Sequence, residues 1–307
     1  MDKYIKDLLY VIRNGSMENT YKMSWCKSIV ESCYMNPKEK IISFERLSRY
    51  IFKYYWDQTI YFDLQQSPNS NKPPEIISYV KEVILKYQSK YGKKPVKFIK
   101  VENKIDIDIN RIVKTLKQDV CWRFLIVNGS EYQLYKLDKR NSTISIPNPQ
   151  IIKEYYDVLF ESINFRWTQK LEDFNSSPRI SKKVRIIDIE DVKRGNLGKF
   201  RVYLDKLGRD CFICNKIIDN ETPSIDHLIP WSYMYSDDLW NLVYTHKSCN
   251  SSKFDKLVSE GDIEKVEKRN KLLFKILNSE NFKDKHMEEL KLSIDRNFPK
   301  KFWIGFK

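Results

Sequence analysis

The sequence predicts an α+β protein with two domains, residues 1–175 and residues 176–307. Three observations support this fold class. Apolar residues recur at three- and four-residue steps through most of the first 120 residues, which is typical of amphipathic helices. From 121 to 146 they alternate around an Asn-Gly turn, which indicates a small antiparallel sheet. Two pairs of Cys and His residues then bracket a compact stretch of the second domain.

The first domain is expected to be mainly helical. Each predicted helix is an apolar stripe among polar residues, and several stripes end at glycine or next to a proline-rich break such as SPNSNKPP. The predicted helices cover residues 4–12, 41–56, Glu75–Tyr91 and Asp108–Gln118.

The period of the sequence changes at Cys121. CWRFLIV, EYQLYKL and STISI are predicted to form an antiparallel meander, closed by Pro147 and Pro149. A long helix is expected over 150–174. The segment NSSPRISKK at 175–183 lacks an apolar period, which favours a domain boundary there.

The two Cys and His pairs have the spacing of a closed zinc site. Cys211-x-x-Cys214 and His246-x-x-Cys249 are half-sites in which a tight turn or a first helical turn aims both ligands at one ion. Residues 208–253 contain few large apolar side chains, so the zinc ion is expected to be a folding element. The remaining cysteines are predicted to be buried thiols in a reducing cytoplasm: Cys26, Cys33 and Cys121.

A second set of polar residues lies between and beside the zinc ligands. Histidine has an unperturbed pKa of roughly 6.5, so His227 is a candidate general base that takes a proton from water near neutral pH. Asp226 and Asn250 offer one carboxylate and one amide oxygen, which suit a hard cation. Asn241 precedes an alternating stretch that is predicted to be a strand. These residue types suit the hydrolysis of a phosphodiester.

The order of these motifs resembles that of the HNH endonucleases. CxxC is followed by Asp-His with Pro230 three residues on, then by Asn-Leu-Val, and then by HxxC-Asn with Lys253 three residues further. The resemblance implies a ββα-metal unit in which the zinc clamp replaces a hydrophobic core. The third letter of the family name is Asn250 here, an oxygen ligand that favours magnesium or manganese.

The resemblance also implies roles for single residues. Asp226 and Asn250 would hold the catalytic magnesium or manganese ion, next to the general base His227. Asn241 would tie down the loop that orients this histidine. Cys211, Cys214, His246 and Cys249 would hold the structural zinc.

The charge of the chain favours a polyanionic partner. Lys and Arg number 55 against 41 Asp and Glu, which gives a formal net charge of +14. DNA is the expected substrate. RNA is an alternative substrate, because no motif in the sequence indicates a site that recognises the 2′-hydroxyl group of RNA. No apolar run approaches membrane-spanning length and no secretory signal is seen, so a cytoplasmic location without membrane contact is expected.

Several alternatives remain open from the sequence. The setting could be restriction or antiphage defence, or the chain could be a homing or mobile-element endonuclease. A non-catalytic, zinc-stabilised nucleic-acid-binding protein is the third reading. The first domain could serve target recognition, regulation or dimerisation, and a homodimer could also use the FWIGF segment at 302–306, which is otherwise expected to dock on the protein.

Overall fold

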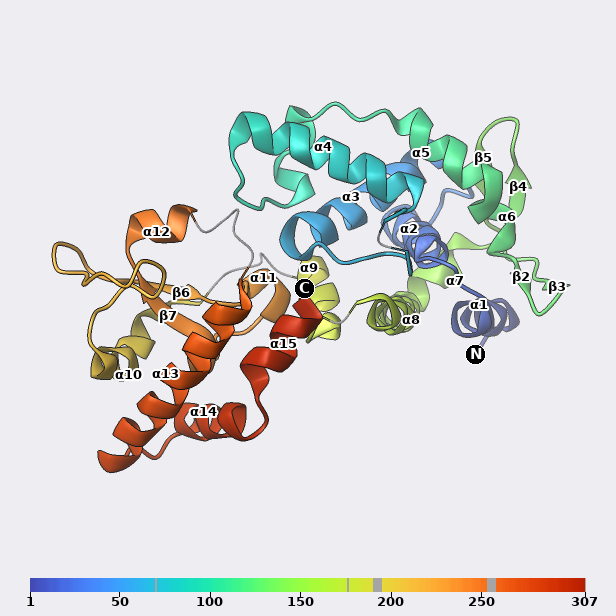
Figure 1. Cartoon of the computed structure of the whole chain (residues 1–307). Coiled ribbons are helices and arrows are strands. Elements are labelled where there is room, and N and C mark those ends of the chain that lie inside the picture. The colour runs from blue at the N-terminus through green and yellow to red at the C-terminus, as the bar shows by residue number, and fades with distance from the viewer. Residues whose placement is uncertain (70, 176, 190–194, 253–257, 307) are drawn as a thin grey trace. The chain divides into compact units, whose positions relative to one another are not determined.

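The computed structural model describes residues 1–69, 71–175, 177–189, 195–252 and 258–306. Contacts group the chain into two compact units (Figure 1). Unit 1 comprises Met1–Asn175 and Ile180–Val192, and unit 2 comprises Ser176–Arg179 and Lys193–Lys307. The roles predicted for the two domains stay predictions.

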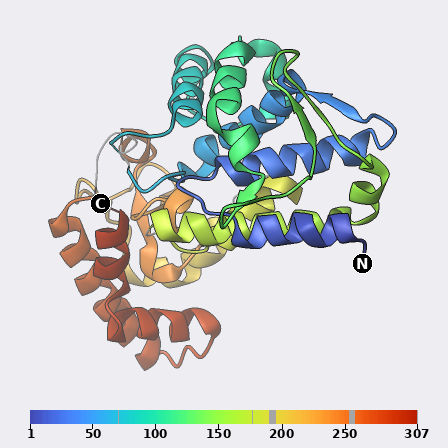
Figure 2. The same cartoon turned by 90° about the vertical axis from the view of Figure 1, so that its right-hand side faces the viewer.

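Unit 1 is mainly helical, as expected (Figures 1 and 2). Its α-helices are α1 (Lys3–Asn14), α2 (Tyr21–Met35), α3 (Phe44–Phe62), α4 (Glu75–Tyr91), α5 (Ile109–Thr115), α6 (Cys121–Arg123), α7 (Pro149–Glu154), α8 (Tyr156–Phe174) and α9 (Ile180–Ile189). Short 3-10 turns η1 (Phe98–Lys100) and η2 (Glu102–Lys104) precede α5, and a π-helical segment η3 (Leu116–Val120) joins α5 to α6.

Helix α2 lies at the centre of unit 1. It contacts α3, α7 and α8, and it is buried on nearly all sides. Because its apolar residues do not form a single stripe, its period carries no signal for an amphipathic helix. Trp25 of α2 is fully buried together with Trp56 of α3 and Trp167 of α8.

The sheets of unit 1 differ in part from the predicted meander. Strand β2 (Ile126–Val127) pairs with β3 (Ser130–Glu131) in a two-stranded sheet, through an Asn128-Gly129 turn in which both residues have positive φ. The predicted first strand was wrong in its first half, because Cys121–Arg123 continues the preceding helix. Strands β4 (Lys136–Asp138) and β5 (Thr143–Ser145) form a separate antiparallel pair.

A third strand completes this second sheet. β1 (Ile41–Ser43) pairs with β5, so that the sheet order is β1-β5-β4. The prediction of a helix over 41–56 was therefore wrong for its first three residues. The helix begins only after Ser43, whose hydroxyl accepts a hydrogen bond from the Arg46 backbone N–H and so caps α3.

Helix α9 begins inside the segment that the sequence predicted as a linker, and a buried ion pair attaches it to unit 1. Lys27 of α2 is 2% exposed, and its Nζ lies 2.6 Å from Asp188 Oδ1 of α9. Asn164 of α8 accepts a second hydrogen bond from the ammonium group at 3.2 Å. The rings of Tyr54 and Phe160 lie 4.8 and 4.6 Å from the same nitrogen.

Unit 2 contains the hairpin and helices of the second domain. Its elements are η4 (Leu197–Phe200), α10 (Arg201–Leu204), η5 (Asp205–Leu207), β6 (Ser224–His227), α11 (Trp231–Met234), η6 (Leu239–Asn241), β7 (Leu242–Thr245), α12 (Lys247–Ser252), α13 (Glu260–Ser279), α14 (Lys285–Asp295) and α15 (Phe298–Phe306). Strands β6 and β7 are antiparallel, with Asp226 opposite Val243 and His227 opposite Leu242.

Unit 2 has a hydrophobic core of its own, which corrects the expectation of few apolar residues around the zinc motif. Phe212, Leu228, Leu239 and Leu242 are buried in one cluster with side chains of α13 and α14. The 208–253 stretch therefore shares a core with the helices that follow it, and the predicted zinc ligands Cys211, Cys214 and Cys249 belong to this core or pack against it.

The 302–306 segment docks on unit 2, as expected. It lies in α15, where Trp303 is 8% exposed and donates a hydrogen bond from Nε1 to the Val258 carbonyl at 2.8 Å. The Phe302 ring stacks on Trp240 with a centroid distance of 5.8 Å. Among the described residues, no helix combines the length and apolar character needed to cross a bilayer.

We expect Asp188→Ala to lower the free energy of unfolding of unit 1 by about 3–5 kcal/mol, because it leaves the buried ammonium of Lys27 without its carboxylate. Asp173→Ala is the matched control, since Asp173 pairs with Lys170 at the surface and should cost less than about 1 kcal/mol. Urea denaturation measures both. Equal midpoints for the two variants would contradict a structural role for the buried pair.

Candidate functional site

The first Cys pair lies in a tight hairpin turn. Cys211 N–H donates to the Lys216 carbonyl at 2.9 Å, and Asn215 N–H donates back to the Cys211 carbonyl at 2.8 Å. Asn215 has a φ of 60°, in the left-handed region that asparagine tolerates. Phe212 N–H donates to the Tyr244 carbonyl at 2.8 Å, which fixes the turn to β7.

The second pair comes from the start of α12. His246 directly precedes the helix and Cys249 lies three residues on, so both side chains face the same side of its first turn. The Asn250 N–H donates to the His246 carbonyl at 2.9 Å and closes this turn. The hairpin turn and the helix start thus bring two half-sites together from positions more than 30 residues apart.

The four predicted zinc ligands form one cluster. The ligand atoms of Cys211, Cys214, His246 and Cys249 all lie within 4.8 Å of one another. His246 Nδ1 is 3.4 Å from the Cys214 sulfur and 3.9 Å from the Cys249 sulfur. A tetrahedral zinc ion with Zn–S bonds of about 2.3 Å and Zn–N bonds of about 2.0 Å spaces its ligands about 3.5–3.8 Å apart. The donor set and its spacing therefore fit zinc.

The electrostatics of the thiols also suit a cation. Burial raises the pKa of Cys211, but backbone N–H groups that point at its sulfur, first that of Cys214, outweigh burial and lower the pKa to about 6. Burial and the neighbouring thiol groups raise the pKa of Cys249 to about 11. Three thiols at this spacing repel one another as thiolates, and a bound divalent ion offsets that repulsion.

The hairpin β6–β7 positions the second set of residues. Asp226 and His227 are the last two residues of β6. Side chains two residues apart in a strand point to the same face, so Asp226 shares a face with Ser224. The Asn250 side chain of α12 donates from Nδ2 to the Ser224 hydroxyl at 3.2 Å. Helix α12 therefore brings Asn250 to the face of the hairpin that carries Asp226.

Asn241 fixes the loop that follows His227. It is 1% exposed, its Oδ1 accepts from the Ile229 N–H at 2.8 Å, and its Nδ2 donates to the Ile229 carbonyl at 2.9 Å. Its own carbonyl accepts from the Leu228 N–H at 2.8 Å. This is the geometry that an orienting role requires, and the role stays a prediction.

The structure adds one residue that the sequence did not single out. His227 is 6% exposed, and its Nε2 lies 2.9 Å from Oδ1 of Asp237, in the loop between α11 and η6. An ionised carboxylate only accepts hydrogen bonds, so Nε2 carries the proton in this pair. In the neutral imidazole, the other ring nitrogen, Nδ1, is then the proton acceptor. The signal in the sequence was an Asp-Asp pair at 237–238 in a loop without an apolar period.

Comparison with known families agrees with this site. Residues 213–259 match the family model described as HNH endonuclease. The match contains every candidate residue except Cys211, which lies two positions before it. The predicted resemblance and the α+β fold with a carboxy-terminal HNH domain are confirmed. Lys253, which also belonged to the predicted motif, lies outside the described residues. No curated protein and no solved structure matches this chain.

We expect Cys214→Ser to release zinc, because three of four ligands hold the ion far less tightly than a closed set. Since unit 2 also has an apolar core, the helical circular dichroism should largely persist while thermal stability falls. Ser248→Ala, an exposed position between two ligands, is the control and should retain about one zinc per chain. Elemental analysis checks both, and a wild-type protein purified without zinc would contradict the assignment.

Proposed function

We propose that this protein is a metal-dependent endonuclease that hydrolyses phosphodiester bonds in DNA. The observation that carries the proposal is the arrangement of β6, β7 and α12, which holds Asp226, His227 and Asn250 on one small scaffold within a segment that matches the HNH endonuclease model. Members of this family are generally nucleases, so nucleic acid is the substrate class that the match implies.

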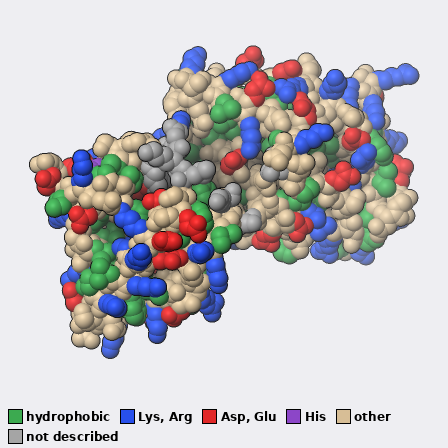
Figure 3. Space-filling model, viewed as in Figure 1, with side chains coloured by type: hydrophobic (Ala, Val, Ile, Leu, Met, Phe, Trp, Pro, Cys, Tyr) green, Lys and Arg blue, Asp and Glu red, His purple; other side chains and the backbone are tan. Residues whose placement is uncertain are grey.

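The charge of the chain supports an anionic substrate. The formal net charge is +14, and Figure 3 shows Lys and Arg side chains distributed over the visible faces of both units. Lys and Arg side chains bind the phosphates of a nucleic acid and so attract it without recognising its base sequence. We assign DNA as the substrate, and RNA is the comparison in the test.

His227 is the general base in this proposal. Its Nδ1 accepts a proton from the attacking water, and Asp237 holds the opposite nitrogen in its protonated form. Asn241 keeps the backbone after His227 in place through its two hydrogen bonds with Ile229. As that proton arrives, the imidazole gains a positive charge, which the Asp237 carboxylate stabilises.

Asp226 and Asn250 would hold the catalytic ion. Their carboxylate and amide oxygens suit magnesium or manganese and leave coordination positions open for phosphate and water. Such an ion, when bound, neutralises charge that develops on the scissile phosphate and on the leaving oxygen. The zinc cluster uses different residues, so its role would be structural.

We place the enzyme in restriction or antiphage defence, where a nuclease domain is joined to a separate domain for target choice or control. This setting rests on the presence of unit 1, a helical unit outside the segment that matches the family. One HNH unit carries one candidate base, so a double-strand break would require two copies of the chain, or two successive nicks.

We expect His227→Ala to lower the cleavage rate by about 10²–10⁴-fold and to leave zinc content and DNA affinity nearly unchanged, because the base acts on water. The assay is a time course on supercoiled plasmid and on RNA, with and without magnesium. Cleavage by His227→Ala at the wild-type rate would contradict the role of His227 as the general base.

Asp226→Ala and Asn250→Ala should also lose activity in the same assay and recover part of it at high manganese.

We expect Asp237→Asn to lower kcat by about 10–100-fold with little change in KM, because an amide can donate to Nε2 and favour the tautomer in which Nδ1 is protonated. Asp237→Glu should restore part of the rate. Asp238→Asn is the matched control, since the Asp238 carboxylate accepts from the Ser236 hydroxyl at 2.5 Å. Identical rates for the two Asn variants would refute an orienting role for Asp237.

A further inference from the structure

The sheet β1-β5-β4 of unit 1 presents an open face to solvent. Its register aligns side chains in two cross-strand rows. Ile41, Ser145 and Lys136 form one row, and Ser43, Thr143 and Asp138 form the other. The residues between these rows, Ile42, Leu137 and Ile144, alternate to the opposite face, where Ile42 and Ile144 are almost fully buried. The outward face is therefore lined mostly by hydroxyl groups and charges.

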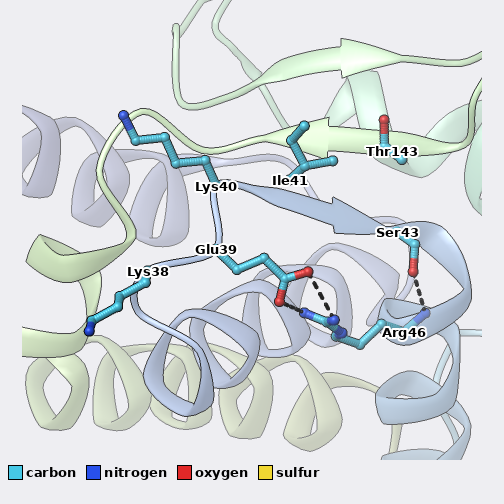
Figure 4. Close-up of a pocket in the computed structure, with 7 residues that line it drawn as sticks. All are labelled: Lys38, Glu39, Lys40, Ile41, Ser43, Arg46 and Thr143. Carbon is cyan, nitrogen blue, oxygen red and sulfur yellow. Dashed lines mark hydrogen bonds and ion pairs between the residues drawn. The ribbon is translucent and has the colours of Figure 1, made fainter.

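A shallow pocket of about 500 Å³ lies at the β1 edge of this face (Figure 4). Its lining includes the Ser43 and Thr143 side chains together with Lys38, Lys40 and Arg46. Arg46 is held by Glu39, with Nη–Oε distances of 2.6 and 3.0 Å. The guanidinium group is thus fixed at the pocket, but its charge is largely offset by the carboxylate.

The sheet face and the segments that border it, the turn between β4 and β5 and the residues before β1, carry an excess of positive charge. Residues 38–43, Arg46 and residues 136–145 include six basic side chains and two carboxylates. One carboxylate, Glu39, pairs with Arg46, and the other, Asp138, accepts hydrogen bonds from the Asn141 backbone and side chain. The other five basic residues are exposed and form no ion pair with the described part of the chain: Lys38, Lys40, Lys136, Lys139 and Arg140.

We infer that this basic sheet face binds the phosphodiester backbone of duplex DNA. Unpaired Lys and Arg side chains neutralise phosphates and release counterions, and Ser and Thr hydroxyls are common donors to phosphate oxygens. The inference rests on the proposed nuclease function and deepens it, because it assigns unit 1 a share of substrate binding. It explains why the unpaired cations occur beside a row of hydroxyl groups.

A simpler explanation is that lysines on edge strands prevent one sheet from pairing with another. Lys40 precedes the edge strand β1, and Lys136 belongs to the edge strand β4, so both positions agree with this explanation. It does not require Arg140 or the hydroxyl groups of Ser43, Thr143 and Ser145. The two explanations differ in what they predict for DNA affinity.

The test is fluorescence anisotropy of a labelled DNA duplex with the 307-residue protein, in buffer to which no magnesium or manganese is added, so that binding is measured without cleavage and without a chelator that would also take zinc. Lys40→Glu with Lys136→Glu is the test variant. Each lost phosphate contact should weaken binding about 8-fold at 0.1 M salt and reduce the slope of log K against log salt by about 0.9. Lys40→Glu and Lys136→Glu are also made singly, and Lys90→Glu, an exposed lysine on α4, is the charge-matched control for each single variant and should alter neither quantity as strongly.

Glu39→Gln supplies a test of opposite sign. It removes a negative charge and frees the Arg46 guanidinium, so DNA binding should become tighter and its salt slope steeper. Unchanged affinity in both the Lys40/Lys136 variant and Glu39→Gln would overturn the inference. Self-association of the double variant in light scattering, with DNA affinity unchanged, would overturn it in favour of edge protection.

This binding measurement does not depend on cleavage. If the wild-type protein binds DNA through this face but cuts no nucleic acid with magnesium, the nuclease proposal fails and the binding face stands. If plasmid is cut normally while the Lys40/Lys136 variant binds and cuts like wild type, the binding face fails and the nuclease proposal stands.

Discussion

The convergence of four soft ligands within 4.8 Å is the constraint on which the candidate site depends. It joins a hairpin turn fixed to β7 with the first turn of α12. Asn250 directly follows the last ligand, so the position of the cluster also determines where its amide lies relative to β6. The Cys and His cluster and the second set of residues are thus coupled through one short helix, although they share no residue.

A second constraint acts from the other side of the hairpin. The buried Asn241 side chain accepts a hydrogen bond from the Ile229 N–H and donates one to the Ile229 carbonyl. These two bonds satisfy backbone and amide groups that would be costly to bury without a partner. The loop after His227 therefore has little freedom to slide along β7. An imidazole held by such a loop and by a carboxylate on Nε2 keeps one orientation, as a positioned base must.

Much of this site could be predicted from the sequence, because its signals are local. Cys211 and Cys214 are recognisable from a two-residue gap, and Asp226-His227 from adjacency. Asp237 could not be found this way, since only the folded loop brings it to the imidazole. Strand β1 was missed because Ile41 and Ile42 share the apolar character of the helical stripe that follows them. Helix α2 was missed because burial on nearly all sides removes its helical period. The core of unit 2 was underestimated because it is completed by α13, α14 and α15, far along the chain.

The stacking of Phe302 on Trp240 has a consequence for the order of synthesis. Trp240 directly precedes Asn241 in the chain. Its ring packs against Phe298 and Phe302, so this part of the core forms only after those residues have been synthesised. Unit 1 can collapse while the ribosome is still translating unit 2, since chains generally fold domain by domain from the amino terminus. Trp240, in the loop of the hairpin that carries His227, is synthesised about 60 residues before Phe302. The candidate nuclease therefore matures after unit 1.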